Sequence, residues 1–320
     1  MDRLEELFVK YRHKDSYIKL GKMLVETPFV NPQDSRLKPS AFQGLWLDWN
    51  EGHRFELNAG VFNKVSPRST TEWVYISESI GLYDHYQNEG TASPINRDIN
   101  LWILGGHIKL NENTRFHNWQ YYINQYSYVN FNQFEWCKSA IKLGLQYVFQ
   151  NGLDEKQLFS EQDLKQESHI VSARMKWIKP RWQVSYNVTQ GLSVGRFTFP
   201  KEWHAKPFYT FISRHRIEAF HEVNSHAVKL DAQPFRTWKQ LNIGLYLART
   251  IYEDVNELTN TRNSRSLSQI SLDLQARLRD NGDNLSFMLL NTFILANEVI
   301  SNPILKEERH LTQLIVNFKF

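Results

Sequence analysis

Cysteine and long apolar runs are nearly absent from this sequence. The 320 residues include one cysteine, Cys137, so the chain can form no internal disulfide and offers no cysteine-based metal cluster. No stretch approaches the about 18 consecutive apolar residues that a transmembrane helix needs. The net charge is only +4, which does not indicate a nucleic-acid partner. These absences exclude a disulfide scaffold and a helical membrane protein.

Catalytic and metal-binding motifs are absent as well. The histidines are scattered without the HExxH spacing of a zinc site, and no GxSxG, P-loop or GxGxxG pattern occurs. The sequence therefore predicts no metal, no cofactor and no enzyme activity. The first residues, Met1 to Glu6, also lack the apolar region of a secretory signal peptide. We therefore expect either a soluble protein or a chain that begins downstream of its natural start.

Aromatic residues, by contrast, are abundant: they make up 14% of the chain, with 10 Trp, 14 Tyr and 20 Phe. This content suits the aromatic girdles of an outer-membrane barrel, although large β-sandwiches are also aromatic-rich. The mean hydropathy is negative, which usually indicates a soluble protein. A membrane barrel can also have a negative mean hydropathy, because half of the residues of each strand face a water-filled lumen. Several tryptophans fall near predicted strand ends, as in a girdle: Trp46, Trp49, Trp119, Trp136, Trp177 and Trp182.

The last segment of the chain, Leu311–Phe320, alternates in polarity. One face is apolar and carries Phe320, Phe318, Val316 and Leu314. The opposite face is polar apart from Ile315. A period of two is that of a β-strand. A strand of this kind that ends on an aromatic residue suits the closing strand of an outer-membrane barrel, and the alternative is the last strand of a soluble sandwich.

The same alternation recurs along the chain in segments of about ten residues, the strand length of such barrels. Leu143 and Leu145, for example, oppose Lys142 and Gly144. The pattern predicts about fifteen strands, linked alternately by short turns and by longer loops. Outer-membrane barrels sort their connections in this way, with short periplasmic turns and long extracellular loops. The sequence therefore favours an all-β fold, a transmembrane antiparallel β-barrel.

The parity of the strands bears on the start of the chain. If the closing strand descends into the periplasm, counting back makes the strand at 7–12 descend as well. Single-chain bacterial barrels have an even number of strands, so the first strand should ascend. We therefore expect an odd number of strands to be absent at the N-terminus, together with the signal peptide.

Two segments resemble a known family, the OprD-type outer-membrane porins. Residues 19–44 are similar to a family strand followed by its third loop, with the Thr-Pro, Asp-Ser-Arg-Leu and Phe-x-Gly elements. Residues 195–214 are similar to the Pro-x-Glu-Trp and Pro-Phe-Phe/Tyr-Thr stretch before a later strand. The resemblance implies a single barrel domain over 1–320, of the 18-stranded porin type, that lacks about three strands.

The resemblance also implies two loops that fold inward and narrow the pore, residues 25–41 and 191–217. In the first loop, Arg36 and Lys38 are candidates for the constriction, and Asp34 could supply the opposite charge. Asp34 could equally bond its own backbone in an Asp-Ser turn, with no role in selectivity.

Basic residues recur on the polar faces of the predicted strands, and the resemblance implies a ladder of such side chains that guides a substrate carboxylate. Arginine suits this task because its fork binds a carboxylate through two hydrogen bonds. In the second loop, Arg214 and Arg216 lie near Tyr209 and could face the same constriction. Alternatively, the bases are water-facing residues countered by Asp48, Glu56 and Asp273, with no role in transport. The strand candidates are Lys10, Lys19, Arg54, Lys142, Arg174, Arg181 and Arg277.

The sequence thus predicts a porin for the passive, selective diffusion of small carboxylate-bearing solutes such as organic acids or amino acids. Its expected place is the bacterial outer membrane, in contact with lipid, as a monomer or weak trimer. One alternative is a soluble or periplasmic β-rich binding or structural protein, which would be extractable without detergent. Another is an outer-membrane barrel enzyme such as a lipase. That enzyme would need a Ser/His pair on the lipid-facing side, and no spacing singles one out.

Overall fold

The computed structural model describes residues 4–32, 38–52, 54–68, 70–80, 99–152, 167–192, 197–203, 207–212, 221–237, 240–256, 261–279, 285–296 and 309–318. The first strands of this described part are β1 Leu7–His13, β2 Ser16–Met23, β3 Ala41–Glu51, β4 Phe55–Ser66, β5 Val74–Tyr75, β6 Leu101–Asn111, β7 Thr114–Ile123 and β8 Ser127–Lys138. The strands that follow are β9 Ile141–Gly152, β10 Ser168–Lys179, β11 Trp182–Gly191, β12 His221–Ala232, β13 Leu241–Asn256, β14 Thr261–Arg279, β15 Leu285–Ala296 and β16 Arg309–Phe318.

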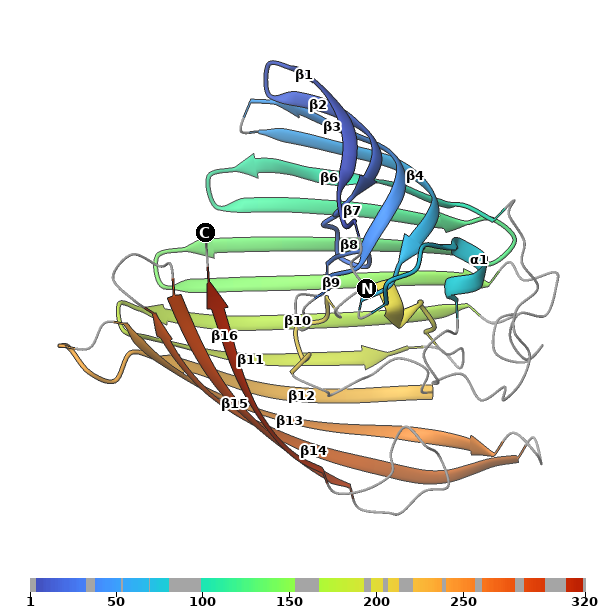
Figure 1. Ribbon diagram of the computed structural model, residues 1–320. Coiled ribbons are helices and arrows are strands. Elements are labelled where there is room, and N and C mark those ends of the chain that lie inside the picture. The colour runs from blue at the N-terminus through green and yellow to red at the C-terminus, as the bar shows by residue number, and fades with distance from the viewer. Residues whose placement is uncertain are drawn as a thin grey trace. The chain divides into compact units, whose positions relative to one another are not determined.

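The strands form one sheet whose order follows the chain. Each strand pairs with its sequence neighbour from β1 to β16, except that β5 lies off this path and pairs with β4 alone (Figure 1). The pairs are antiparallel, as where Lys10 lies opposite Lys19 and Leu289 lies opposite Leu314. This meander confirms the all-β antiparallel prediction, and its strand count agrees with the number expected from alternation.

The chain divides into two compact units. The first comprises Met1–Phe134, Gln146–Ile170 and Leu192–Pro207, and the second comprises the rest, Glu135–Leu145, Val171–Gly191 and Phe208–Phe320. The prediction of a single barrel domain over 1–320 stays a prediction.

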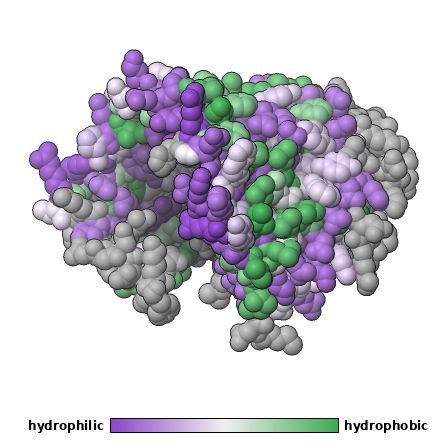
Figure 2. Space-filling view, turned by 90° about the horizontal axis from the view of Figure 1, so that it is seen from above, coloured by the Kyte–Doolittle hydropathy of each residue, from purple (hydrophilic) through white to green (hydrophobic). Residues whose placement is uncertain are grey.

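The two faces of each strand differ in exposure. On β6 and β7, Leu104 and Tyr122 are 46% and 42% exposed, whereas Ile103 and Tyr121 are buried. We call the face of Leu104 the outer face and the face of Ile103 the inner face. Hydrophobic side chains reach the molecular surface in the space-filling view (Figure 2), as expected for an outer face that meets lipid rather than water.

The inner face is apolar in places where the sequence alternation predicts polar residues. Ile103 and Tyr121 are both buried inner-face residues, and Phe29 of the β2–β3 connection packs against the Tyr121 ring. An inner face that is covered by protein can carry apolar residues, whereas one that faces water is polar. Strands β6 and β7 therefore have apolar residues on both faces, and their sequence alternates less clearly in polarity.

Short turns and long connections alternate over most of the sheet. Short turns join β1 to β2, β3 to β4, β6 to β7, β8 to β9 and β10 to β11, and long connections join β2 to β3, β4 to β6, β9 to β10 and β11 to β12. The connection from β7 to β8 departs from this alternation, because it spans only residues 124–126. Gln125 takes a φ of 66° there, and the Tyr126 N–H donates to the Ile123 carbonyl at 2.9 Å, which closes a tight turn.

The predicted loop at 64–96 contains structure that periodicity did not indicate. It carries β5 and the short helix α1, Ile76–Ser79. A separate 3-10 turn, Lys201–Trp203, lies in the connection between β11 and β12. Among the described residues, no helix is long and apolar enough to cross a bilayer. Strand β14 also begins at Thr261, earlier than its apolar alternation suggested, because its first residues are almost all polar.

Glycine permits a close approach between β1 and β2. Gly21 of β2 has a φ of 134°, and a Cβ there would lie 2.3 Å from the Leu7 carbonyl oxygen. A side chain at this position would both strain the backbone and separate β1 from β2.

Candidate functional site

An aromatic cluster fixes the segment after β2 against the inner face of the first unit. Phe29 is fully buried, and its ring centroid lies 5.7 Å from those of Tyr121 and Phe131. The rings of Phe197 and Phe199 lie 5.3 and 5.2 Å away. Edge-to-face and tilted contacts of this kind add to the burial of apolar area. Phe29 therefore ties residues from the β2–β3 and β11–β12 connections to strands β7 and β8.

Hydrogen bonds support the same cluster. The Phe29 N–H donates to the Tyr121 hydroxyl oxygen at 3.1 Å, and that hydroxyl donates to Thr27 Oγ1 at 3.0 Å. Thr27 in turn donates to the Val30 carbonyl at 2.9 Å. Each of these groups is buried, so the bonds remove desolvation penalties that would otherwise oppose the packing.

The 3-10 turn is bonded to three other stretches of the first unit. Ser40 donates to the Glu202 carbonyl and the Asn31 N–H donates to the Trp203 carbonyl, each at 2.9 Å. The Trp203 indole N–H donates to Ser79 Oγ of α1 at 3.0 Å. These buried contacts join connections that are far apart in the sequence into one packed body.

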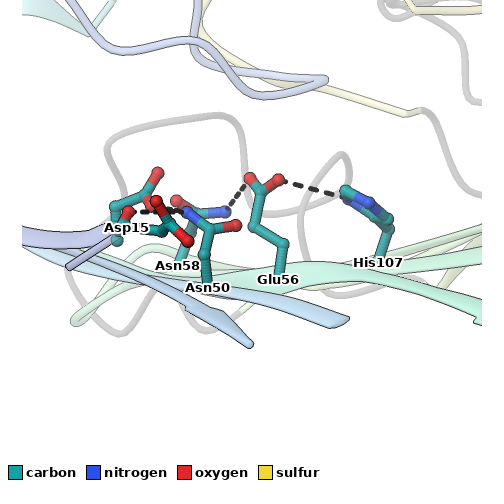
Figure 3. A network of polar contacts seen from close by, with 6 residues as sticks. Asp15, Asn50, Glu56, Asn58 and His107 are labelled. Atoms are coloured by element: carbon teal, nitrogen blue, oxygen red, sulfur yellow. Dashed lines mark hydrogen bonds and ion pairs between the residues drawn. The ribbon is translucent and has the colours of Figure 1, made fainter. Parts of the chain in front are cut away.

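A polar row crosses the inner face of β3, β4 and β6 (Figure 3). Asn58 donates to Glu56 Oε1 at 2.8 Å, and His107 Nδ1 lies 3.5 Å from Glu56 Oε2. Asn50 lies opposite Glu56 in the sheet and donates to the Asp15 carbonyl at 3.4 Å. The acidic group of this row, Glu56, thus lies between side-chain amides and a histidine. Asn58 falls on the predicted polar face, but its amide and His107 were not among the candidates because neither carries a fixed charge.

Two of the predicted bases lie beside each other on β1 and β2. Lys10 and Lys19 are opposite residues of this pair. The Lys10 ammonium lies 4.0 Å from the centroid of Tyr17, and that of Lys19 lies 4.5 Å from the centroid of Phe8. Contact with a ring face holds each cation near the strand surface without neutralising it.

In the second unit, Arg174 of β10 is held by an acid and an aromatic ring. Its Nη2 lies 3.1 Å from Glu135 Oε1, and its guanidinium carbon lies 4.2 Å from the centroid of Tyr209. A quarter of the Arg174 side chain remains exposed, at 25%. The guanidinium is thus fixed on two sides while part of the side chain remains exposed.

The segment that carries Tyr209 is itself bonded to the sheet. The Tyr209 N–H donates to Ser172 Oγ at 3.3 Å, and Thr210 donates to Thr189 Oγ1 at 2.8 Å. Burial raises the pKa of the Tyr209 hydroxyl. Gly144 of β9 makes the room for that hydroxyl, because a Cβ there would lie 2.4 Å from its oxygen.

Two other predicted bases lie at turns rather than on strand faces. Arg181 occupies the β10–β11 turn and donates to the carbonyls of Gln233 and Pro234 at 2.8 and 2.7 Å. Arg54 is exposed in the turn before β4, where its carbonyl accepts the Lys109 N–H at 2.8 Å. The Arg181 guanidinium thus links two turns of the protein, which its predicted place on a strand face does not suggest.

The other strand candidates differ in their surroundings. Lys142 is exposed near the start of β9. Arg277 is exposed on β14, where it donates to Gln275 Oε1 at 2.8 Å and approaches Met288 Sδ at 3.2 Å. Lys38 is half-buried. The remaining candidates of the two loops, Asp34, Arg36, Arg214 and Arg216, lie outside the described residues.

Comparisons with known proteins agree with this architecture. A family model described as outer membrane porin, OprD family, matches residues 5–188. Pseudomonas aeruginosa OccD3 (OpdP) is 16% identical, with a TM-score of 0.77 over 98% of this chain and 77% of that one. P. aeruginosa OpdK, solved with vanillate, is 13% identical, with a TM-score of 0.77 over 97% and 77%. P. aeruginosa OpdO is 14% identical, with a TM-score of 0.75 over the same shares.

At these identities the solved structures show the fold, and the family match shows the relationship. No curated protein sequence matches the chain. The predicted transmembrane antiparallel β-barrel of the 18-stranded porin type is confirmed, as is the bacterial outer membrane as its location. The alternative of a soluble β-rich protein is wrong. The chain belongs to the OprD family of outer membrane porins, which are selective channels for small solutes.

Proposed function

We propose that this porin passes small carboxylate-bearing solutes, organic acids or amino acids, by passive diffusion, without catalysis and without a cofactor. The observation that carries the proposal is the setting of Arg174. Glu135 and Tyr209 fix the guanidinium, and its remaining N–H groups can donate hydrogen bonds to the carboxylate of a passing solute. The presence of vanillate, a carboxylate, in the OpdK structure supports the same chemistry.

Glu135 partly neutralises the charge of Arg174, and this suits a channel site that binds a solute weakly. A channel needs binding that is favourable enough for entry and weak enough for exit. A lone buried arginine would hold a carboxylate tightly, whereas the Glu135 carboxylate at 3.1 Å competes for the same donors. Arg174 therefore offers a solute a short-lived contact.

The bases of the first unit extend the proposal along the pore wall. Lys10 and Lys19 lie opposite each other, the first exposed and the second half-buried, and each ammonium lies over an aromatic ring. We assign Lys142 and Arg277, which are also exposed, to the same ladder. The acids Asp48 and Glu56 interrupt it, so a solute that carries an ammonium as well as a carboxylate would find partners for both groups.

The two inward loops, 25–41 and 191–217, are proposed as the constriction. Supporting this, Phe29 packs on the inner face of the first unit and Tyr209 packs against Gly144 in the second. Arg36, Lys38, Asp34, Arg214 and Arg216 are proposed to line its rim.

The test is a planar-bilayer recording of the protein with benzoate as the probe. We expect an anion-selective reversal potential under a salt gradient and a concentration-dependent block by benzoate. Arg174→Gln should weaken that block about tenfold, because it removes a charged hydrogen-bond donor. Arg181→Gln is the matched control: it removes the same charge from a turn where the guanidinium bonds backbone carbonyls. Equal block in all three proteins would contradict the role of Arg174.

A further inference from the structure

An arginine and a histidine lie beside each other on the outer face of β12 and β13. His226 of β12 is opposite Arg249 of β13, and both side chains are exposed. Two residues along each strand, on the same face, Val228 is opposite Leu247, and these are 44% and 47% exposed. A charged group and an imidazole thus adjoin an apolar surface of the kind that meets lipid.

A tyrosine of the neighbouring strand β11 holds the histidine ring. The Tyr186 hydroxyl oxygen lies 2.7 Å from His226 Nδ1, and the two rings are stacked with their centroids 6.0 Å apart. When the hydroxyl donates to Nδ1, the neutral ring carries its proton on Nε2. That Nε2–H group can then donate to a ligand, as the guanidinium of Arg249 can.

A second tyrosine–histidine pair, in the first unit, has the same construction but a different neighbour. The Tyr147 hydroxyl oxygen lies 2.8 Å from His169 Nδ1, and the ring centroids are 6.1 Å apart. Nε2 of His169 lies 3.7 Å from the Glu167 carboxylate. His226, by contrast, has a base beside it, and within the described residues no ion pair involves Arg249. The first pair therefore has its anion within the protein, and the second pair offers its donors to an anion from outside.

Arg249 lies toward the extracellular edge of the apolar band. Strand β13 begins at Leu241, on the side of the short β10–β11 turn, and runs toward the side of the long β11–β12 connection. In outer-membrane barrels these are the periplasmic and the extracellular side. With a rise of about 3.3 Å per residue and a tilt of about 40°, the strand climbs about 20 Å from Leu241 to Arg249. The band is about 25 Å tall, so a long arginine side chain reaches the level of the lipid headgroups.

The anion that membranes present at this level is the phosphate of the lipid headgroup. An arginine fork matches phosphate because it donates two parallel hydrogen bonds to its oxygens. We propose that Arg249 and His226 bind the phosphate of a lipid in the outer leaflet. The guanidinium supplies two donors and His226 Nε2 supplies a third. This site lies on the outer wall and is separate from the proposed path of solutes.

The apolar row below the site distinguishes a lipid from free phosphate. Val228 and Leu247 extend the outer surface toward the membrane centre, where the acyl chains of a bound lipid would lie. A lipid therefore gains from both parts of the surface, whereas free phosphate meets only two exposed donor residues and must lose its water to do so.

The first test measures lipid binding to the detergent-purified protein by native mass spectrometry. The probes are dioleoyl phosphatidic acid and dioleoylglycerol, which share their acyl chains and differ in the phosphate. We expect the protein to retain phosphatidic acid in preference, and Arg249→Gln to weaken that binding about tenfold through loss of a charged donor. Arg249→Lys keeps the charge without the fork and should lie between the two. Heat-modifiable migration on gels checks that each variant is folded. Equal retention of both lipids by the unchanged protein would overturn the proposal.

The second test uses matched variants and a competitor. Arg236→Gln removes an exposed arginine from the β12–β13 turn, at the opposite end of the same strands, and should leave binding unchanged. His226→Gln should weaken binding, whereas His169→Gln should not, because its Nε2 already faces Glu167. A loss in Arg236→Gln as large as in Arg249→Gln would reduce the effect to general attraction of an anionic lipid and overturn the site. Displacement of phosphatidic acid by inorganic phosphate alone would show a site for free anions and overturn the assignment to lipid.

Discussion

The two segments that are proposed to form the constriction are held by different kinds of chemistry. In the first unit, Phe29 contacts four aromatic rings, and the N–H groups of Phe29 and Val30 are both hydrogen-bonded. In the second unit, Tyr209 lies on the Arg174 guanidinium, and Gly144 makes room for its hydroxyl. Apolar burial presents no charge for a solute to compete for, whereas a cation–aromatic contact involves the charge that a solute would seek. We therefore expect the first segment to stay in place and the second to take part in selectivity.

The largest effect is expected from breaking the aromatic cluster. Phe29→Ala removes a buried ring that contacts Tyr121, Phe131, Phe197 and Phe199, and should lower the free energy of unfolding by about 3–5 kcal/mol. The loosened segment should raise single-channel conductance. Denaturant unfolding in detergent and bilayer recordings measure the two effects.

The control for that change is Leu104→Ala, which also shortens an apolar side chain of the first unit but on the outer face, at 46% exposure. Conductance should not change in this variant. A Phe29→Ala protein with unchanged conductance would mean that the first segment does not narrow the pore.

A smaller effect is expected from crowding the second segment. In Gly144→Ala the new Cβ would lie 2.4 Å from the Tyr209 hydroxyl oxygen, so the ring must move from Arg174 at a cost of about 1–3 kcal/mol. Benzoate block should change because the guanidinium loses one of its two supports. Gly191→Ala is the matched control, since its Cβ would meet its nearest neighbour at an ordinary 3.4 Å. Equal benzoate block in the two alanine variants would show that Gly144 does not influence selectivity.

Sequence alternation predicted the positions of some of these residues and not of others. Strand alternation placed Arg174 and Lys142 on one face correctly, because period two is a local property of the chain. The same period placed Arg181 and Arg54 on strand faces, whereas both lie at turns where the period no longer applies. The enclosure of Phe29 could not be predicted, since its partners come from segments that meet only in the folded protein.

The faces of β7 and β8 mark a second limit of what the sequence could predict. Asn118 and Asn132 read as ordinary polar residues of a strand, and their neighbours Trp119 and Phe131 read as apolar ones. Alternation alone does not say which face meets lipid when the inner face is covered by protein. Burial resolves this: Trp119 and Phe131 are inner-face residues against packed segments, which leaves the amides on the outer face.

The smallest effect is expected from the Tyr209 hydroxyl, and it separates the two roles of that residue. The hydroxyl is buried and has no hydrogen-bond partner among the described residues. Tyr209→Phe removes this unsatisfied group and keeps the ring on Arg174, so stability should rise by up to about 1 kcal/mol. Benzoate block and reversal potential should stay as they are. If block weakened as much as in Arg174→Gln, the hydroxyl itself would contact the solute. The second segment would then recognise solutes directly instead of only supporting the arginine that does.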